Sequence, residues 1–177
     1  GVSAWRSVLC PSDLAGVRTI NLASAMPTIT DPVILDATTQ SGYVAGSPVI
    51  VLDGTGAGAE ANGFVLQASN SIITGFRIQN FVSGTTSVTG TGIVIDGTTG
   101  GGDNNSISQN YVTNNSESVT GAVGAISITG AADNNLITNK QLVNNNRDGI
   151  RFTDDLSNGA QIPNTVLSGR GDTGGKL

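Results

Sequence analysis

The sequence predicts an all-β fold: a right-handed, single-stranded parallel β-helix of about five to seven coils with asparagine ladders. Three observations lead to this prediction. An asparagine-rich segment occurs at 69–80, 104–114 and 134–144, with separations of 34 and 30 residues. Aliphatic residues recur at equivalent places in each copy, and helix formers in amphipathic register are missing. Such a period, carried by aliphatic residues and asparagines, is typical of stacked β-coils.

Three columns of equivalent residues pass through the copies. They are Ile73, Ile107 and Ile137; Ile78, Val112 and Leu142; and Asn80, Asn114 and Asn144. Because equivalent segments of successive coils run the same way, the strands are expected to be parallel, and such connections are right-handed in nearly all proteins. Coils would stack about 4.8 Å apart, and each buried aliphatic side chain would contribute roughly 1.5–3 kcal/mol.

A second type of strand, with period-2 alternation, precedes each asparagine segment. The alternation assigns these residues to the interior: Phe64, Leu66, Ile93, Ile95, Ile126, Ile128, Ile150 and Phe152. The outward positions are expected to be Val51, Val65, Val94, Ser127 and Arg151. A fourth asparagine segment begins at Asn164, where Val166 is expected one period after Ile137.

The whole chain is expected to form one domain, 1–177, with coils over 19–167. Residues 1–18 would form an N-terminal cap or an irregular segment, and 168–177 a tail. Upstream strands are predicted at 19–23, 32–37 and 47–54. The asparagines are expected to adopt left-handed backbone at turns and to bond one another between coils. The two ladders would be Asn70–Asn104–Asn134 and Asn80–Asn114–Asn144.

Composition excludes several classes of protein. The net charge of −5 argues against a nucleic-acid binder, and no apolar run approaches the length of a membrane span. The first residues lack the pattern of a signal peptide. The chain has no histidine, which removes the commonest general base and zinc ligand. We therefore expect no metal and no cofactor, with calcium at the oxygen-rich segments 100–106 and 153–159 as the alternative.

The repeats NNSISQNYVTNN (104–115) and NNLITNKQLVNN (134–145) resemble those of right-handed β-helices of the pectin-lyase-like superfamily. Residues 25–43 and 47–64 resemble a segment of large bacterial secreted and surface proteins. The resemblance implies an extracellular or cell-surface location and a polysaccharide partner. It leaves activity open, because the superfamily includes lyases, hydrolases, epimerases, adhesins and stalks. Residues 7–16 depart from the usual entry helix, and 170–177 replace the expected last strand.

An acidic residue closes each of three strands, namely Asp36, Asp53 and Asp96. If Asp36 and Asp53 lay in adjacent coils, their carboxylates would be about 5 Å apart, as in retaining glycosidases. The alternative is that each carboxylate caps a turn. The enzyme hypothesis takes Asp53, Asp96 and Arg151 as catalytic. It takes Gln67, Thr129, Thr153 and Arg77 as ligand-binding.

Three functional hypotheses follow. The first is a non-catalytic structural or binding module of a bacterial surface or secreted protein that contacts carbohydrate. The second is a polysaccharide lyase or glycoside hydrolase acting on an outer sheet face. The third is a solenoid that self-assembles into a homo-oligomer through an unfinished C-terminal coil. The insertions 83–92 and 116–124 would lie side by side as a flap, and Arg170-Gly171-Asp172 is treated as a chance match.

Overall fold

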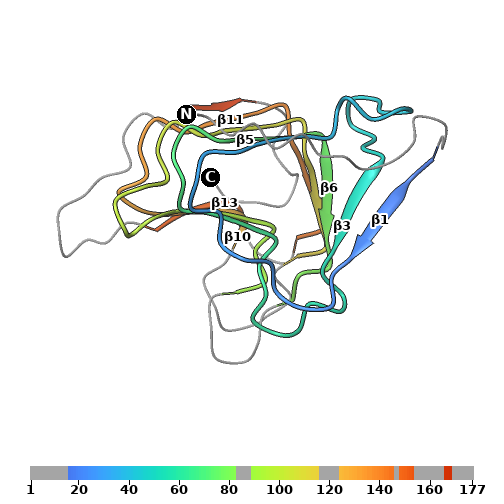
Figure 1. Cartoon of the computed structure of the whole chain (residues 1–177), viewed down its shortest axis with the longest axis horizontal. Coiled ribbons are helices and arrows are strands. Elements are labelled where there is room, and N and C mark those ends of the chain that lie inside the picture. The colour runs from blue at the N-terminus through green and yellow to red at the C-terminus, as the bar shows by residue number, and fades with distance from the viewer. Residues whose placement is uncertain (1–15, 83–88, 116–123, 146–147, 154–165, 169–177) are drawn as a thin grey trace.

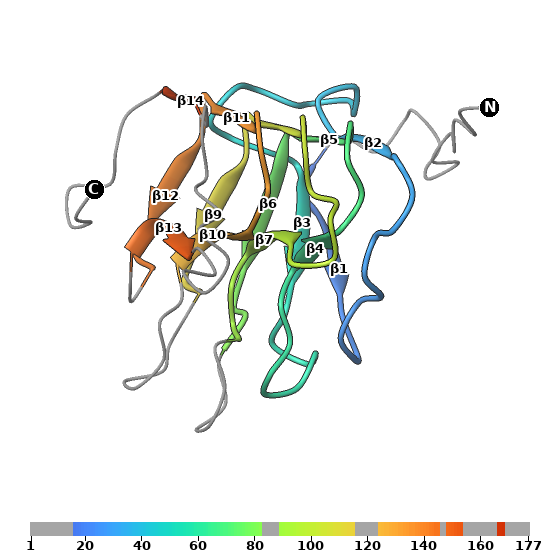
Figure 2. The ribbon, with the colours of Figure 1, turned by 90° about the vertical axis from the view of Figure 1, so that its left-hand side faces the viewer.

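The described part of the chain forms three parallel β-sheets around one core. The computed structural model describes residues 16–82, 89–115, 124–145, 148–153 and 166–168. Figure 1 shows the sheets as sides of a tube, and Figure 2 shows the strands of successive coils side by side. Every pairing between the named strands is parallel, and none of the described residues is helical. The predicted all-β class with parallel stacking is confirmed.

The strands fall into sheets that we name A, B and C. Sheet A consists of β1 (Arg18–Asn21), β3 (Ile50–Asp53), β6 (Phe76–Gln79), β9 (Tyr111–Thr113) and β12 (Gln141–Val143). Sheet B consists of β4 (Phe64–Leu66), β7 (Ile93–Gly97), β10 (Gly124–Gly130) and β13 (Asp148–Thr153). Sheet C consists of β2 (Ile34–Asp36), β5 (Ile72–Thr74), β8 (Ser106–Ser108), β11 (Leu136–Thr138) and β14 (Val166–Ser168). From β4 to β12 the chain visits B, C and A in turn.

The core consists of aliphatic columns that run along the tube. Ile73, Ile107 and Ile137 pair in register and are fully buried. Leu35 and Leu167 extend the same register at its two ends. The prediction that Val166 is the equivalent of Ile137 in the next coil was wrong by one residue. The structure repeats the preceding 30-residue spacing and pairs Leu167 with Ile137.

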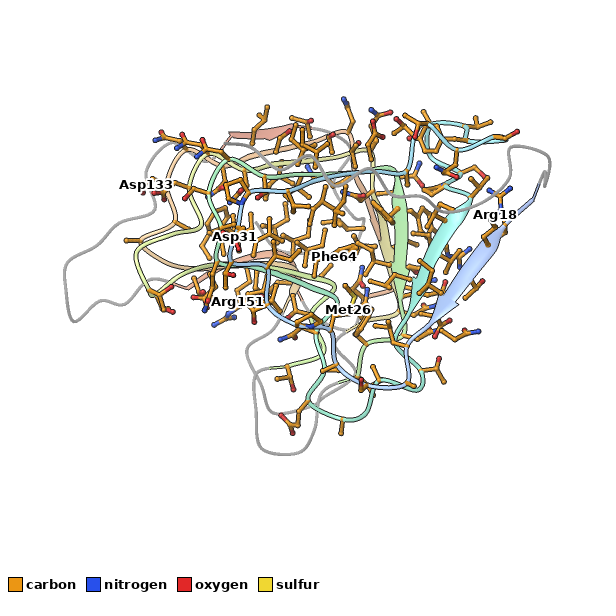
Figure 3. The ribbon with its side chains drawn as sticks, in the orientation of Figure 1. Arg18, Met26, Asp31, Phe64, Asp133 and Arg151 are labelled. Atoms are coloured by element: carbon orange, nitrogen blue, oxygen red, sulfur yellow. The ribbon has the colours of Figure 1, made fainter. Side chains whose placement is uncertain are left out.

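The alternate side chains of sheet B that were assigned to the interior also point inward as predicted, with one exception. Phe64, which lies inside the tube in Figure 3, packs edge-on against Phe76 at 5.4 Å between ring centroids. Phe152, expected inside, is 42% exposed, because its strand β13 is the last of its sheet. Val51 was assigned to the outer face of this sheet, but it lies in sheet A and is buried.

Residues in the left-handed region of the backbone turn the chain at two corners of each coil and where sheet A ends. They recur every five residues, at Asn70, Gly75 and Asn80; at Asn104, Gln109 and Asn114; and at Asn134, Asn139 and Asn144. Their φ angles lie between 48° and 79°. Asparagine and glycine tolerate this conformation better than other residues. The predicted left-handed turns are therefore confirmed.

The ladders that join the coils are made by the next residue along the chain, and not by the predicted asparagines. Asn105 is buried, accepts a hydrogen bond from the Ser71 N–H at 2.7 Å and donates one to the Ala68 carbonyl at 3.1 Å. Asn115 does the same for the Phe81 N–H and the Ile78 carbonyl, at 3.0 and 3.1 Å. We call this set the inner row: Asn105, Asn110, Asn115, Asn135 and Asn145.

Five of the six predicted ladder residues lie outside the tube, and the sixth, Asn80, is half-buried and donates its amide to Asp53. Asn70, Asn104, Asn114, Asn134 and Asn144 are exposed, and among the described residues no hydrogen bond joins their side chains. At these five positions the left-handed residue directs its side chain to solvent, and the side chain of the next residue points inward. We call Asn104, Asn114, Asn134 and Asn144 the outer row.

Residues 38–47, which we call the strap, cross several coils between sheets C and A. At one end, a Cβ on Gly75 would lie 2.7 Å from Thr38 Cγ2. In the middle, the Tyr43 hydroxyl donates to Gln109 Oε1 at 3.2 Å. At the far end, a Cβ on Gly46 would meet the Gln141 amide. Figure 2 shows this segment along the top of the coils.

Several predictions concern residues outside the described ranges. They are residues 1–15 of the N-terminal cap, the tips of the two insertions, the start of the segment at Asn164 and residues 169–177 of the C-terminal tail. The described flanks of the insertions do leave sheet A and enter sheet B in successive coils, between β6 and β7 and between β9 and β10.

Candidate functional site

The three acidic strand ends adopt one local structure. In each, a threonine two residues later donates both its N–H and its hydroxyl to the same aspartate oxygen. The N–H distances are 2.8–3.0 Å and the hydroxyl distances are 2.6 Å, for Asp36–Thr38, Asp53–Thr55 and Asp96–Thr98. The carboxylates therefore cap turns, which was the alternative given for them in the sequence analysis.

The condition on which the glycosidase-like pair of Asp36 and Asp53 depended is not met. Asp36 ends β2 in sheet C and Asp53 ends β3 in sheet A, so the two are not equivalent positions of adjacent coils. Asp36 pairs with Thr74, and Asp53 pairs with Gln79. Asp96 lies in sheet B, so each carboxylate belongs to a different side of the tube.

Asp96 gathers two of the predicted binding residues around it. Gln67 Nε2 donates to Asp96 Oδ2 at 2.9 Å, and Thr129 Oγ1 donates to Oδ1 at 3.3 Å. Burial raises the pKa of Asp96, but the hydrogen bonds from Gln67, Thr98 and Thr129 outweigh it, so the pKa lies below its ordinary value. Thr153 pairs with Thr129 one strand further on. The site is thus an ionised carboxylate held by neutral donors.

Asp53 forms the corresponding cluster at the end of sheet A. Its Oδ2 accepts from Gln79 Nε2 at 2.7 Å and from Asn80 Nδ2 at 2.9 Å. Burial raises the pKa of Asp53, and the hydrogen bonds from Thr55, Gln79 and Asn80 lower it further than burial raises it. The net pKa is below the ordinary value, and Asp53 is also a carboxylate with its oxygens occupied.

The basic residues lie apart from both carboxylates. Arg151 pairs with Ser127 in sheet B, and its guanidinium lies 3.2 Å from Asp148 Oδ2. Arg77, in sheet A, places its guanidinium carbon 5.3 Å from the centroid of the Tyr111 ring, a cation–π contact. The structure therefore brings Gln67, Asp96 and Thr129 together, but it does not bring Asp53 or Arg77 to them.

A groove of about 860 Å³ lies where sheet A ends and the chain turns toward sheet B. We call it the corner groove. Its described lining consists of Thr55, Asn80, Val82, Asn114, Asn115, Asn144 and Asn145. Asn115 and Asn145 belong to the inner row, and Asn114 and Asn144 to the outer row.

Sequence reasoning assigned Asn80, Asn114 and Asn144 a purely structural role and did not identify a groove. The signal that could have located it is the position of these asparagines, each directly after a strand of sheet A and before a connection to sheet B. Side chains from equivalent positions must share one edge of the tube.

Among the described residues, no three histidine, cysteine, aspartate or glutamate side chains gather to hold a metal ion. The described part of the chain also contains no helix long and apolar enough to cross a membrane. Comparison of the chain with protein-family models, curated proteins and solved structures gave no match.

Proposed function

We propose that the chain is a non-catalytic structural or binding module of a bacterial extracellular or cell-surface protein. It is a right-handed β-helix of the pectin-lyase-like type, with about five to seven coils, and it contacts carbohydrate. One observation carries the proposal: the two candidate catalytic carboxylates are both saturated by hydrogen bonds and lie in different sheets.

Glycoside hydrolysis needs one carboxyl group whose pKa is raised, so that it can donate a proton. Asp53 and Asp96 have lowered pKa values, because neutral donors stabilise the charged form of each. A lyase needs a base close to the acidic carbon of its substrate. Arg151 is engaged by Asp148, and Arg77 lies in sheet A, away from the Asp96 cluster in sheet B. The turn-capping geometry explains both carboxylates without catalysis.

The runner-up is a polysaccharide lyase or glycoside hydrolase on the outer face of sheet B. It is favoured by the cluster of Gln67, Asp96 and Thr129, three polar side chains from neighbouring strands. One experiment separates the non-catalytic module from the enzyme. The protein is incubated with uronate-containing and neutral glycans, and reducing ends and unsaturated products are measured.

We expect no turnover from the wild-type chain, and the same result from Asp53→Asn and Asp96→Asn. The matched control is Asp31→Asn, which changes an exposed carboxylate elsewhere. Turnover that Asp96→Asn or Asp53→Asn abolishes, and Asp31→Asn retains, would contradict the non-catalytic role and establish the runner-up.

Self-assembly is a second proposal, supported by core residues at the two ends of the tube. Ile20 in β1 and Phe152 in β13 both belong to inward columns, yet each is 42% exposed. A second copy docked end to end would continue the parallel ladders and cover them. Light scattering over a concentration series should show a dimer or longer stack that Phe152→Asp weakens. A monomer at every concentration would refute this proposal.

A further inference from the structure

The corner groove presents a row of amide side chains at the repeat of the fold. Asn80, Asn114 and Asn144 each directly follow a strand of sheet A, namely β6, β9 and β12, which pair in register. The Asn80 N–H donates to the Asn114 carbonyl at 3.2 Å, so the register continues beyond the strands. Neighbouring members are therefore spaced by about 4.8 Å, the distance between strands.

Two members of this row keep their hydrogen-bonding capacity. An asparagine side chain offers two donors and an acceptor. Asn115 and Asn145, at the base of the groove, use theirs to join coils. The Asn80 amide is held by Asp53. Asn114 and Asn144 are exposed, and no described residue bonds their side chains. Their amides are available to a ligand.

The described charge beside the groove disfavours an anionic ligand. None of the described residues that line it is charged. The Asp53 carboxylate borders it through Thr55 and Asn80, and Asp53 stays ionised because its pKa is low. An anionic polymer would meet this negative charge with no described cation in the lining to offset it. Val82 supplies one apolar surface for C–H groups.

We propose that the corner groove binds an extended, uncharged polysaccharide that runs parallel to the axis of the tube. Hydroxyl groups both donate and accept, as amides do, so successive sugars can bond Asn114 and Asn144 in successive coils. The inference rests on the proposed binding role and adds to it a place, a direction and a ligand class. It differs from the sheet B face, where the sequence placed the candidate binding residues Gln67, Thr129 and Thr153.

The fold supplies a matched control for the test. Asn114 and Asn144 have φ of 53°, and Asn104 and Asn134, at the corner between sheets B and C, have φ of 54° and 56°. All four are exposed, and glycine adopts this backbone without strain. The double variant Asn114→Gly/Asn144→Gly removes two groove amides. The double variant Asn104→Gly/Asn134→Gly removes two equivalent amides outside the groove.

The probes are hexamers of β-1,4-linked glucose, xylose and mannose, with soluble dextran and with hexagalacturonate as the charged counterpart. Binding is measured by calorimetry, and the folding of each variant is checked by thermal melting. We expect at least one neutral glycan to bind, and hexagalacturonate to bind more weakly. The groove variant should lose roughly tenfold in affinity, the scale of two neutral hydrogen bonds, while the control variant changes less than twofold.

The inference is overturned if no neutral glycan binds, if both double variants lose affinity equally, or if hexagalacturonate binds best. Failure of the proposed function would look different. Product formation from any glycan would contradict the non-catalytic role, whereas a glycan that binds without being cleaved, and whose affinity both double variants reduce equally, would rule out only the groove.

Discussion

The inner and outer rows of asparagine lie one residue apart along the chain and differ in almost every physical property. Asn105 and Asn115 are buried, and each bonds the backbone of the preceding coil. Asn104 and Asn114 have left-handed backbone and are exposed. The inner row stabilises the stack of coils, whereas the outer row turns the chain and exposes its side chains to solvent. Residue type therefore says little here until the backbone conformation of each position is known.

The largest difference should appear when an inner asparagine is removed. Asn105→Ala would leave the Ser71 N–H and the Ala68 carbonyl without their partner inside the tube. Each buried group that loses its partner costs about 1–3 kcal/mol, so the free energy of unfolding should fall by about 2–6 kcal/mol. Chemical denaturation measures this change. A loss below about 0.5 kcal/mol would show that the inner row does not join the coils.

The outer row should respond to backbone conformation and not to the loss of the amide. Alanine tolerates the left-handed region less well than asparagine, although both carry a Cβ, so Asn104→Ala should cost about 1–2 kcal/mol. Asn104→Gly should be nearly neutral, because glycine adopts that region freely. The comparison between the two variants in one denaturation series isolates the backbone term. Equal losses for alanine and glycine would instead indicate that the Asn104 side chain contributes to stability.

A smaller effect is expected on the pH dependence of the free energy of unfolding. Asp53 and Asp96 have pKa values below the ordinary 3.8, so both favour the folded state when ionised. That stabilisation is present above about pH 4 and is lost as the pH falls through the lowered pKa values. The free energy of unfolding should therefore decrease between about pH 5 and pH 2, and less steeply in Asp53→Asn/Asp96→Asn.

The control for this measurement is Asp31→Asn, which removes an exposed carboxylate that caps none of these three turns. An identical slope in the double variant and the wild type would mean that the capped turns do not contribute to folding through their charge.

Columns that repeat could be predicted from the sequence, whereas features that depend on a single turn could not. Ile73, Ile107 and Ile137 were aligned correctly because their spacing is the coil length itself. The ladder was assigned to Asn104 and not to Asn105 because both positions of the doublet are asparagine, and only the φ angle distinguishes them.

The candidate site was harder to predict for a related reason. Asp36 and Asp53 look equivalent, since each ends a strand and precedes a turn. The structure places them in sheets C and A, with the strap between them. The strap has no counterpart in later coils, so no repeat revealed the change of sheet. The local turn at each aspartate was predictable, because it depends only on residues two positions apart.

The contrast between the two asparagine rows depends on coils stacked in register, which methyl NMR can test directly. With only isoleucine δ1 methyl groups labelled, Ile107 should show nuclear Overhauser contacts to both Ile73 and Ile137, because it lies between them in sheet C. Ile73 and Ile137, two strands apart, should show a much weaker contact or none. A strong contact between Ile73 and Ile137, or none from Ile107 to either, would contradict the stacking.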